Sequence, residues 1–195
     1  MAYGTGKLAT YLALPFAWAL DLPSVMGWYG LLWLSFDKRL WRKQLPYIKR
    51  SVSDIPDLHG TWVGSLKSEY VPTGATQPVP VNIPIFLLIL QTWTEIRVKA
   101  YTSKSVSCST MAALHTSDAH DAGLKYEYFN EPRALEVDSM QTHRGTGHLE
   151  HTSKDTLKGS YYNGRGRRTI GTLELRRTSA TILDPDTALP PPTTP

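Results

Sequence analysis

The sequence is poor in cysteine throughout and poor in charge near its start. Cys108 is the one cysteine in 195 residues, which excludes an intrachain disulfide and a cysteine-rich metal site. Its setting, SVSCST, is typical of a small buried hydrophobe in a strand rather than of a nucleophile. Between Leu8 and Phe36 the only charged side chain is Asp21, and so little charge over that length indicates a membrane segment.

The apolar run at 8–36 is long enough for one bilayer crossing, which takes roughly 20 residues. Pro15 and Pro23 predict a break at LDLPS, which leaves one kinked span, a re-entrant hairpin or two short helices as options. The competing interpretation is a secretory signal peptide that ends at AWA, residues 17–19. Hydrophobicity resumes after that site, and this favours a membrane anchor.

Six basic side chains follow the apolar run, within residues 38–50. Lysine and arginine flank membrane segments on the cytoplasmic side, and Trp33, Trp41 and Tyr47 lie where an aromatic belt would. We therefore expect an anchor in the cell inner membrane, with everything after residue 37 in the cytoplasm. The net charge of +4 favours anionic partners, but it is small for a protein that coats DNA or RNA, so neither polymer is expected.

From DLHGTWVGSLKS onward the composition becomes β-rich, and apolar and polar residues alternate. Turn signals such as VPTGATQP, SDAHDAG and YNGRG separate the strands, and no helix of normal length is predicted. This pattern favours an antiparallel barrel or a sandwich, and the all-β, eight-stranded antiparallel barrel is our fold prediction. The interior of such a barrel is just large enough for one small ligand. The predicted strands are 58–68, 80–91, 93–102, 105–115, 122–129, 146–153, 156–162 and 168–177.

The chain is thereby predicted to have four parts. Residues 1–37 form the helical transmembrane region, 38–56 a basic juxtamembrane linker and 57–178 the barrel. Residues 179–195 contain five prolines and are predicted to be a disordered tail.

Alternation assigns faces to the strands. Four inward rows are predicted: Ile96, Val98 and Ala100; Leu124, Tyr126 and Tyr128; Leu157, Gly159 and Tyr161; and Thr169, Gly171, Leu173 and Leu175.

The segment YYNGRGRRT combines stacking rings with cations, and a related pattern recurs in YEYFNEPR at 126–133. Arginine offers paired donors to phosphate, glycine lets backbone amides approach it, and tyrosine stacks on bases. The alternative is a solvated hairpin turn, for which Asn-Gly is a common signal. The ligand-binding candidates are Tyr161, Tyr162, Asn163, Arg165, Arg167 and Arg168, then Tyr126, Tyr128 and Arg133, and lastly Trp93 and Thr94.

Other chemistries find less support. In HRGTGHLEH, His148 and Glu150 face away from His151 on a strand, so no metal site is predicted. No nucleophile elbow or phosphate-binding lysine loop is present, so we expect no enzyme and no cofactor. GTW at 60–62 is similar to the first strand of lipocalin-like barrels, in which a tryptophan closes one end beside a last-strand arginine. Trp62 is therefore expected to meet Arg176 or Arg177.

With DLHGTWVGSL opening the barrel, ILQTWTEIRVKAYTSKSVSCSTMAAL in its middle and LKGSYYNGRGRRTIGTLEL closing it, the chain resembles one known group. These are the CBASS antiphage membrane effectors, two-transmembrane β-barrel proteins associated with CD-NTases. The resemblance implies a barrel that binds a cyclic dinucleotide made by a partner nucleotidyltransferase, the task that STING performs with another fold. Binding then promotes homo-oligomerisation, disruption of the inner membrane and death of the infected cell.

Three alternatives remain open at this point. Panoptes-type systems look similar but hold the effector inactive with a constitutively made cyclic dinucleotide. A lipocalin-like, membrane-anchored carrier would bind an apolar ligand instead. A membrane-tethered scaffold would bind another protein through its edges or loops.

Overall fold

The computed structural model describes residues 17–43, 55–70, 79–116, 122–164 and 169–185. The chain divides into two compact units. The first is Met1–Asp54 together with Thr92–Thr94, and the second is Ile55–Gln91 with Glu95–Pro195.

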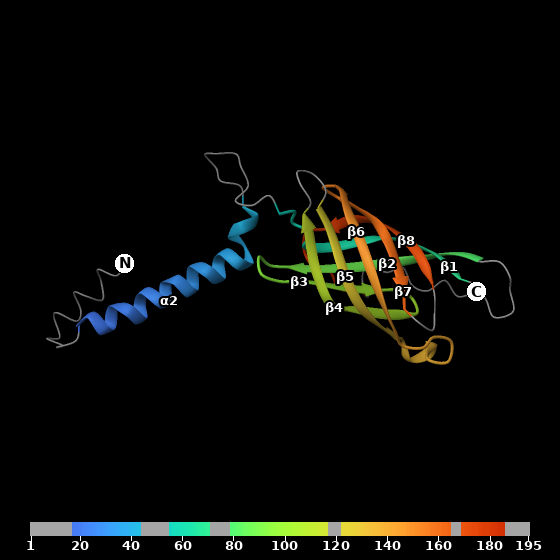
Figure 1. Cartoon of the computed structure of the whole chain (residues 1–195), viewed down its shortest axis with the longest axis horizontal. Coiled ribbons are helices and arrows are strands. Elements are labelled where there is room, and N and C mark those ends of the chain that lie inside the picture. The colour runs from blue at the N-terminus through green and yellow to red at the C-terminus, as the bar shows by residue number, and fades with distance from the viewer. Residues whose placement is uncertain (1–16, 44–54, 71–78, 117–121, 165–168, 186–195) are drawn as a thin grey trace. The chain divides into compact units, whose positions relative to one another are not determined.

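The first unit contains helix α2 (Ala17–Lys38) and a short 3₁₀ turn, η1 (Leu40–Arg42) (Figure 1). The break predicted at LDLPS is absent, because α2 runs through Pro23 without interruption. A proline removes one backbone hydrogen bond from a helix interior, and here the helix continues on both sides of it. Among the described residues, no helix has both the length and the mean hydropathy required of a membrane span.

The second unit is a closed antiparallel barrel of eight strands in sequence order, as the alternation predicted (Figure 1). β8 pairs with β1 to close it. The strands are β1 (Gly60–Tyr70), β2 (Val79–Gln91), β3 (Ile96–Tyr101), β4 (Ser105–Thr116), β5 (Ala122–Pro132), β6 (His143–Ser153), β7 (Thr156–Asn163) and β8 (Ile170–Ser179). A second 3₁₀ turn, η2 (Ala134–Glu136), lies between β5 and β6.

The four inward rows predicted from alternation are confirmed. Val98, Leu124, Leu157 and Leu175 are each at most 3% exposed and belong to one apolar core, and Ile96 packs against it. Because side chains alternate strictly between the two faces of a strand, one correct assignment fixes the whole row.

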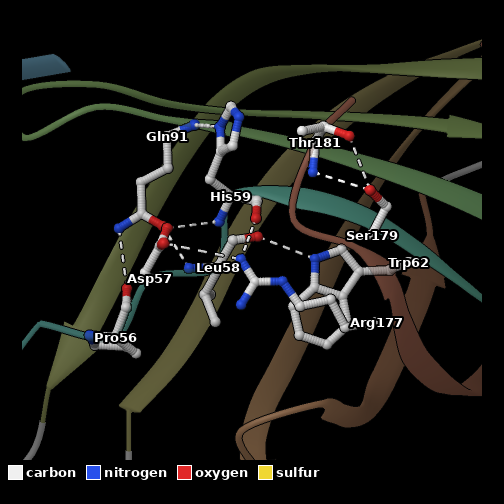
Figure 2. Close-up of polar contacts among 9 residues, drawn as sticks. All are labelled: Pro56, Asp57, Leu58, His59, Trp62, Gln91, Arg177, Ser179 and Thr181. Carbon is white, nitrogen blue, oxygen red and sulfur yellow. Dashed lines mark hydrogen bonds and ion pairs between the residues drawn. The ribbon is translucent and has the colours of Figure 1, made fainter. Parts of the chain in front are cut away.

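Trp62 and Arg177 close one end of the barrel, which we call the tryptophan end. The Arg177 guanidinium lies 5.5 Å from the centre of the Trp62 ring, and Trp62 Nε1 donates to Leu58 O over 2.9 Å (Figure 2). Arg177 also donates to the carbonyl oxygen of His59 and lies 3.8 Å from Asp57 Oδ2. The expected pairing of tryptophan with a last-strand arginine is confirmed, with Arg177 as the partner.

Gln91 fastens the segment before β1 to the same end. Its side chain is buried, accepts from Leu58 N at 2.7 Å and donates to Pro56 O at 3.0 Å (Figure 2). These contacts satisfy backbone groups that no strand partner reaches.

The chain after β8 stays on the barrel wall. Thr61, which is fully buried on β1, donates to Thr181 O at 2.8 Å and accepts from Leu183 N at 2.9 Å. Contacts with the barrel therefore continue beyond the boundary at 178 that the sequence predicted, while 186–195 lie outside the described residues.

Gly159 provides a test of the strand packing. A Cβ added there would overlap the carbonyl oxygen of His148 on β6, so the G159A change must push β6 and β7 apart. We expect it to destabilise the barrel by about 1–3 kcal/mol, as overpacking does. Thermal unfolding measures this, with G164A as the control because a Cβ there meets only ordinary contact. Equal melting temperatures for G159A and wild type would contradict the close approach.

Gln91 provides a second test. Q91L leaves the Leu58 N–H and the Pro56 carbonyl without their partner, and each unpaired buried group costs about 1–3 kcal/mol. We expect a clear loss of stability in urea unfolding. E174Q is the matched control, because it removes only an exposed ion pair with Lys158 and should unfold like wild type. Equal midpoints for Q91L and E174Q would rule out this role of Gln91.

Candidate ligand-binding site

Three tyrosines face the interior of the barrel at the end opposite Trp62, which we call the tyrosine end. It is the end at which β5 and β7 finish and β6 and β8 begin. Tyr126 and Tyr128 lie on β5 and Tyr161 on β7, and they are 6%, 8% and 7% exposed. The centres of the Tyr126 and Tyr128 rings are 5.8 Å apart. The end is thus aromatic, in contrast to the aliphatic core.

Each of these rings lies against a glycine on a neighbouring strand. Tyr126 pairs with Gly147 and Tyr128 with Gly145, and Tyr161 pairs with Gly171. A Cβ on any of these glycines would overlap the ring of its tyrosine. Each ring therefore lies close against the neighbouring strand, in the space that a side chain at the glycine would take. Aromatic rings of this kind can stack with flat ligands.

A chain of hydrogen bonds joins two of the wall strands at this end. The Tyr128 hydroxyl donates to Asn163 Oδ1 over 2.7 Å, and Asn163 Nδ2 donates to Thr169 Oγ1. Asn163 N also donates to Thr169 O over 2.9 Å. These bonds fix the two residues on either side of the segment 164–168 and hold the Tyr128 ring in place.

A second polar group lies on β4 and β5. Ser107 Oγ donates to Asn130 Oδ1 over 2.7 Å, and Asn130 Nδ2 lies 3.5 Å from Met140 Sδ. Asn130 is 4% exposed. Together with the tyrosines, these side chains offer neutral hydroxyl and amide groups to the interior.

Burial also affects the ionisation of one ring. It raises the pKa of Tyr126 above the usual value and so further disfavours the phenolate, and the hydroxyl is protonated at physiological pH. A protonated hydroxyl can donate a hydrogen bond, and it places no negative charge near an anionic ligand.

Cationic side chains lie at the rim of the tyrosine end. Arg133 follows β5, Arg144 is the second residue of β6, and both are exposed. Lys104, in the turn between β3 and β4, lies 3.3 Å from Glu136 Oε2. The predicted Arg165, Arg167 and Arg168 fall between β7 and β8 but lie outside the described residues.

The structure separates the predicted candidates into three groups. Tyr126, Tyr128, Tyr161 and Asn163 gather at the tyrosine end, with Arg133 at its rim. Tyr162 is adjacent to Tyr161 in sequence, but it faces the outside of the barrel and is 57% exposed. The structure therefore separates these two candidates, because neighbouring residues of a strand point to opposite sides.

Trp93 and Thr94 belong to the helix unit instead. The Trp93 ring packs 5.2 Å from Phe36 and 6.0 Å from Trp41, centre to centre. Thr94 donates to Asp37 Oδ1 from its backbone N, over 2.9 Å, and from its hydroxyl, over 2.8 Å. Both residues directly follow β2, whose last residue is Gln91, and so they are not brought to the tyrosine end.

Sequence reasoning missed Asn130, Ser107 and Arg144. Asn130 continues the inward row of Tyr126 and Tyr128, so extending that row by two residues would have found it. Ser107 had no such signal, because it becomes relevant only through its pairing with Asn130 across β4 and β5. Among the residues that the structure describes, no group of three or more histidine, cysteine or acidic side chains could hold a metal.

Comparison with known proteins adds two findings. Residues 53–177 match the family model described as Cap15, cyclic dinucleotide receptor domain. The chain is also 30% identical over 160 residues to CD-NTase-associated protein 15 of Yersinia aleksiciae, and the match covers 80% of this chain and 71% of that protein. The matched residues include the whole barrel up to Arg177, the arginine that closes the tryptophan end. The chain therefore belongs to the Cap15 family of CBASS effectors.

Proposed function

We propose that this protein is an antiphage sensor and effector whose barrel binds a cyclic dinucleotide at the tyrosine end. The observation that carries the proposal is the group of three inward-facing tyrosine rings, each laid over a glycine of a neighbouring strand. Flat, neutral bases stack on such faces at about 1–3 kcal/mol per base. The match to a cyclic dinucleotide receptor domain supports the same ligand class.

The phosphates of the ligand require cations and access to solvent. We place them at the rim, with Arg133 and Arg144, and assign the same role to Arg165, Arg167 and Arg168. Arginine binds phosphate through paired hydrogen bonds, and burying a phosphate among neutral groups would cost far more. The bases then point into the barrel and the phosphates outward.

Helix α2 is the proposed membrane element. Its described side chains are exposed and apolar on several sides, among them Met26, Trp28, Leu31 and Leu32, which are 47–67% exposed. A helix that is apolar all round requires an apolar environment. The basic residues after it support an inner-membrane location with the barrel in the cytoplasm.

The barrel and helix α2 together suggest how ligand binding leads to membrane damage. The ligand, made by a partner nucleotidyltransferase, controls homo-oligomerisation of the membrane segments, and their assembly disrupts the inner membrane and ends infection by killing the cell. The ligand needs only to bind the assembled and the unassembled protein with different affinities, so the barrel acts as a sensor without catalysis.

The same binding site would also suit the opposite regulation, in which a constitutively made cyclic dinucleotide holds the effector inactive, as in Panoptes-type systems. An apolar carrier is less compatible with the hydroxyl and amide groups at the tyrosine end.

Tyr161 and Tyr162 form a matched pair for testing the site, because they are neighbours on β7 with opposite faces. We expect Y161A to weaken cyclic dinucleotide binding by about 1–3 kcal/mol through the lost stacking contact, and Y162A to bind like wild type. Calorimetric titration of the purified full chain with a panel of cyclic dinucleotides measures this. Wild-type affinity in Y161A, or no binding of any panel member by the folded wild type, would overturn the proposal.

Charged substitutions in α2 test whether this helix anchors the protein in the membrane. Replacing Leu31 and Leu32 with lysine should move the protein from the membrane fraction to the soluble fraction, because each lysine in a bilayer costs about 2.5–3.5 kcal/mol. Carbonate extraction of membranes from expressing cells measures the distribution. M111K is the control, since Met111 is a similarly exposed apolar residue on the barrel wall. If the double variant partitions like M111K, α2 is not the anchor.

A further inference from the structure

Among the described residues, the amide nitrogen of Asn130 has only a weak hydrogen-bond acceptor. Its carboxamide has two N–H donors, and Ser107 already occupies its oxygen. Among the described residues, the only acceptor near Nδ2 is the thioether sulfur of Met140, at 3.5 Å. A thioether is a weak acceptor, and a buried amide N–H that lacks a strong acceptor is unfavourable. At 4% exposure, Asn130 has little contact with water to compensate for this.

The position of Asn130 relative to the tyrosines explains what it could bind. Tyr126, Tyr128 and Asn130 follow one another at every second position on the inner face of β5. Successive inward residues are spaced by about 7 Å along a strand. A base stacked on the Tyr128 ring would therefore lie within reach of the Asn130 amide.

The hydrogen bonds of Asn130 also indicate which part of the ligand it could bind. Phosphates require cations, and the described cations of this end, Lys104, Arg133 and Arg144, are at the rim. The neutral amide of Asn130 suits an uncharged acceptor, either a ring nitrogen or a carbonyl oxygen of a base. Ser107 holds the amide oxygen and so fixes which side of the carboxamide faces the ligand.

We propose that Asn130 is the specificity-determining residue of the site, where it reads the edge of one nucleobase by donating its amide hydrogens to a ring nitrogen or a carbonyl oxygen. This inference rests on the proposed function, because it requires a cyclic dinucleotide at the tyrosine end. It assigns base identity to a side chain on β5 and leaves the arginines to bind every member of the ligand class alike.

The N130D variant tests this, since it keeps the shape of the side chain and replaces both donors with an acceptor. The full chain, wild type and variant, is titrated with cyclic di-AMP, cyclic di-GMP and cyclic UMP-AMP. The added charge repels the phosphates of all three equally, so the informative quantity is the ratio of their affinities. We expect this ratio to change by about tenfold or more, towards guanine, whose N1–H and N2–H₂ groups can donate to a carboxylate.

Two further variants separate base reading from a structural role. S107A releases the amide oxygen and should reduce the discrimination between the three ligands. M140L keeps the volume of the side chain that covers Asn130 and should leave the affinity ratios within twofold of wild type. Melting temperatures are recorded for all variants, and the ratios are compared for proteins shown to be folded.

The outcomes distinguish the two proposals. A folded wild type that binds none of the three nucleotides overturns the proposed function and this inference together. A wild type that binds, with N130D lowering all three affinities by one common factor or leaving them unchanged, overturns the role of Asn130 alone. A changed ratio in N130D with an unchanged ratio in M140L supports it.

Discussion

The pairing of β8 with β1 is the constraint on which the rest of the barrel depends. It joins strands that are separated by almost the whole domain, from Glu69 with Ile170 to Thr61 with Ser179. Once the sheet is closed, every strand has two neighbours and every inward side chain faces a shared interior. Trp62 and Arg177, which lie on the two closing strands, can stack only because this pairing places them together. Closure therefore creates both the core and the tryptophan end.

The two ends of the barrel differ in the side chains that face the interior, although inward and outward residues alternate along the strands at both ends. At the tryptophan end, large apolar rings, Gln91 and Arg177 fill the interior and bind backbone groups of the segment before β1. At the tyrosine end, glycines replace side chains on the facing strands and tyrosine rings lie in the space left. Packing stabilises the first end, and hydroxyl and amide groups gather at the second. The ligand site that we propose therefore lies apart from the Trp62 contacts that close the other end.

Much of this organisation was accessible from the sequence. The eight strands and their inward rows follow from alternation and turn signals, which are local properties of the chain, and the contact of Trp62 was expected from the similarity of GTW to lipocalin-like barrels. Tyr162 was selected by residue type in a cluster, and the structure places it on the outer face, because neighbours on a strand point to opposite sides. The break expected at Pro23 was wrong because one missing hydrogen bond does not end a long helix. Asn130 was missed because its amide becomes notable only beside Ser107 and Met140, which come from other parts of the chain.

The sequence by itself determined which residues face inward on four of the strands, where the apolar segment and the basic run lie, and that rings and arginines occur together. Period-two alternation and composition need no knowledge of strand neighbours. Tertiary structure alone decided which rings meet which glycines, that Tyr128 binds Asn163 across 35 positions, and that Trp93 packs with Phe36 and Trp41. The physical reason is register. Cross-strand neighbours depend on how the sheet closes and where bulges shift it, and a one-residue slip would exchange every one of these contacts.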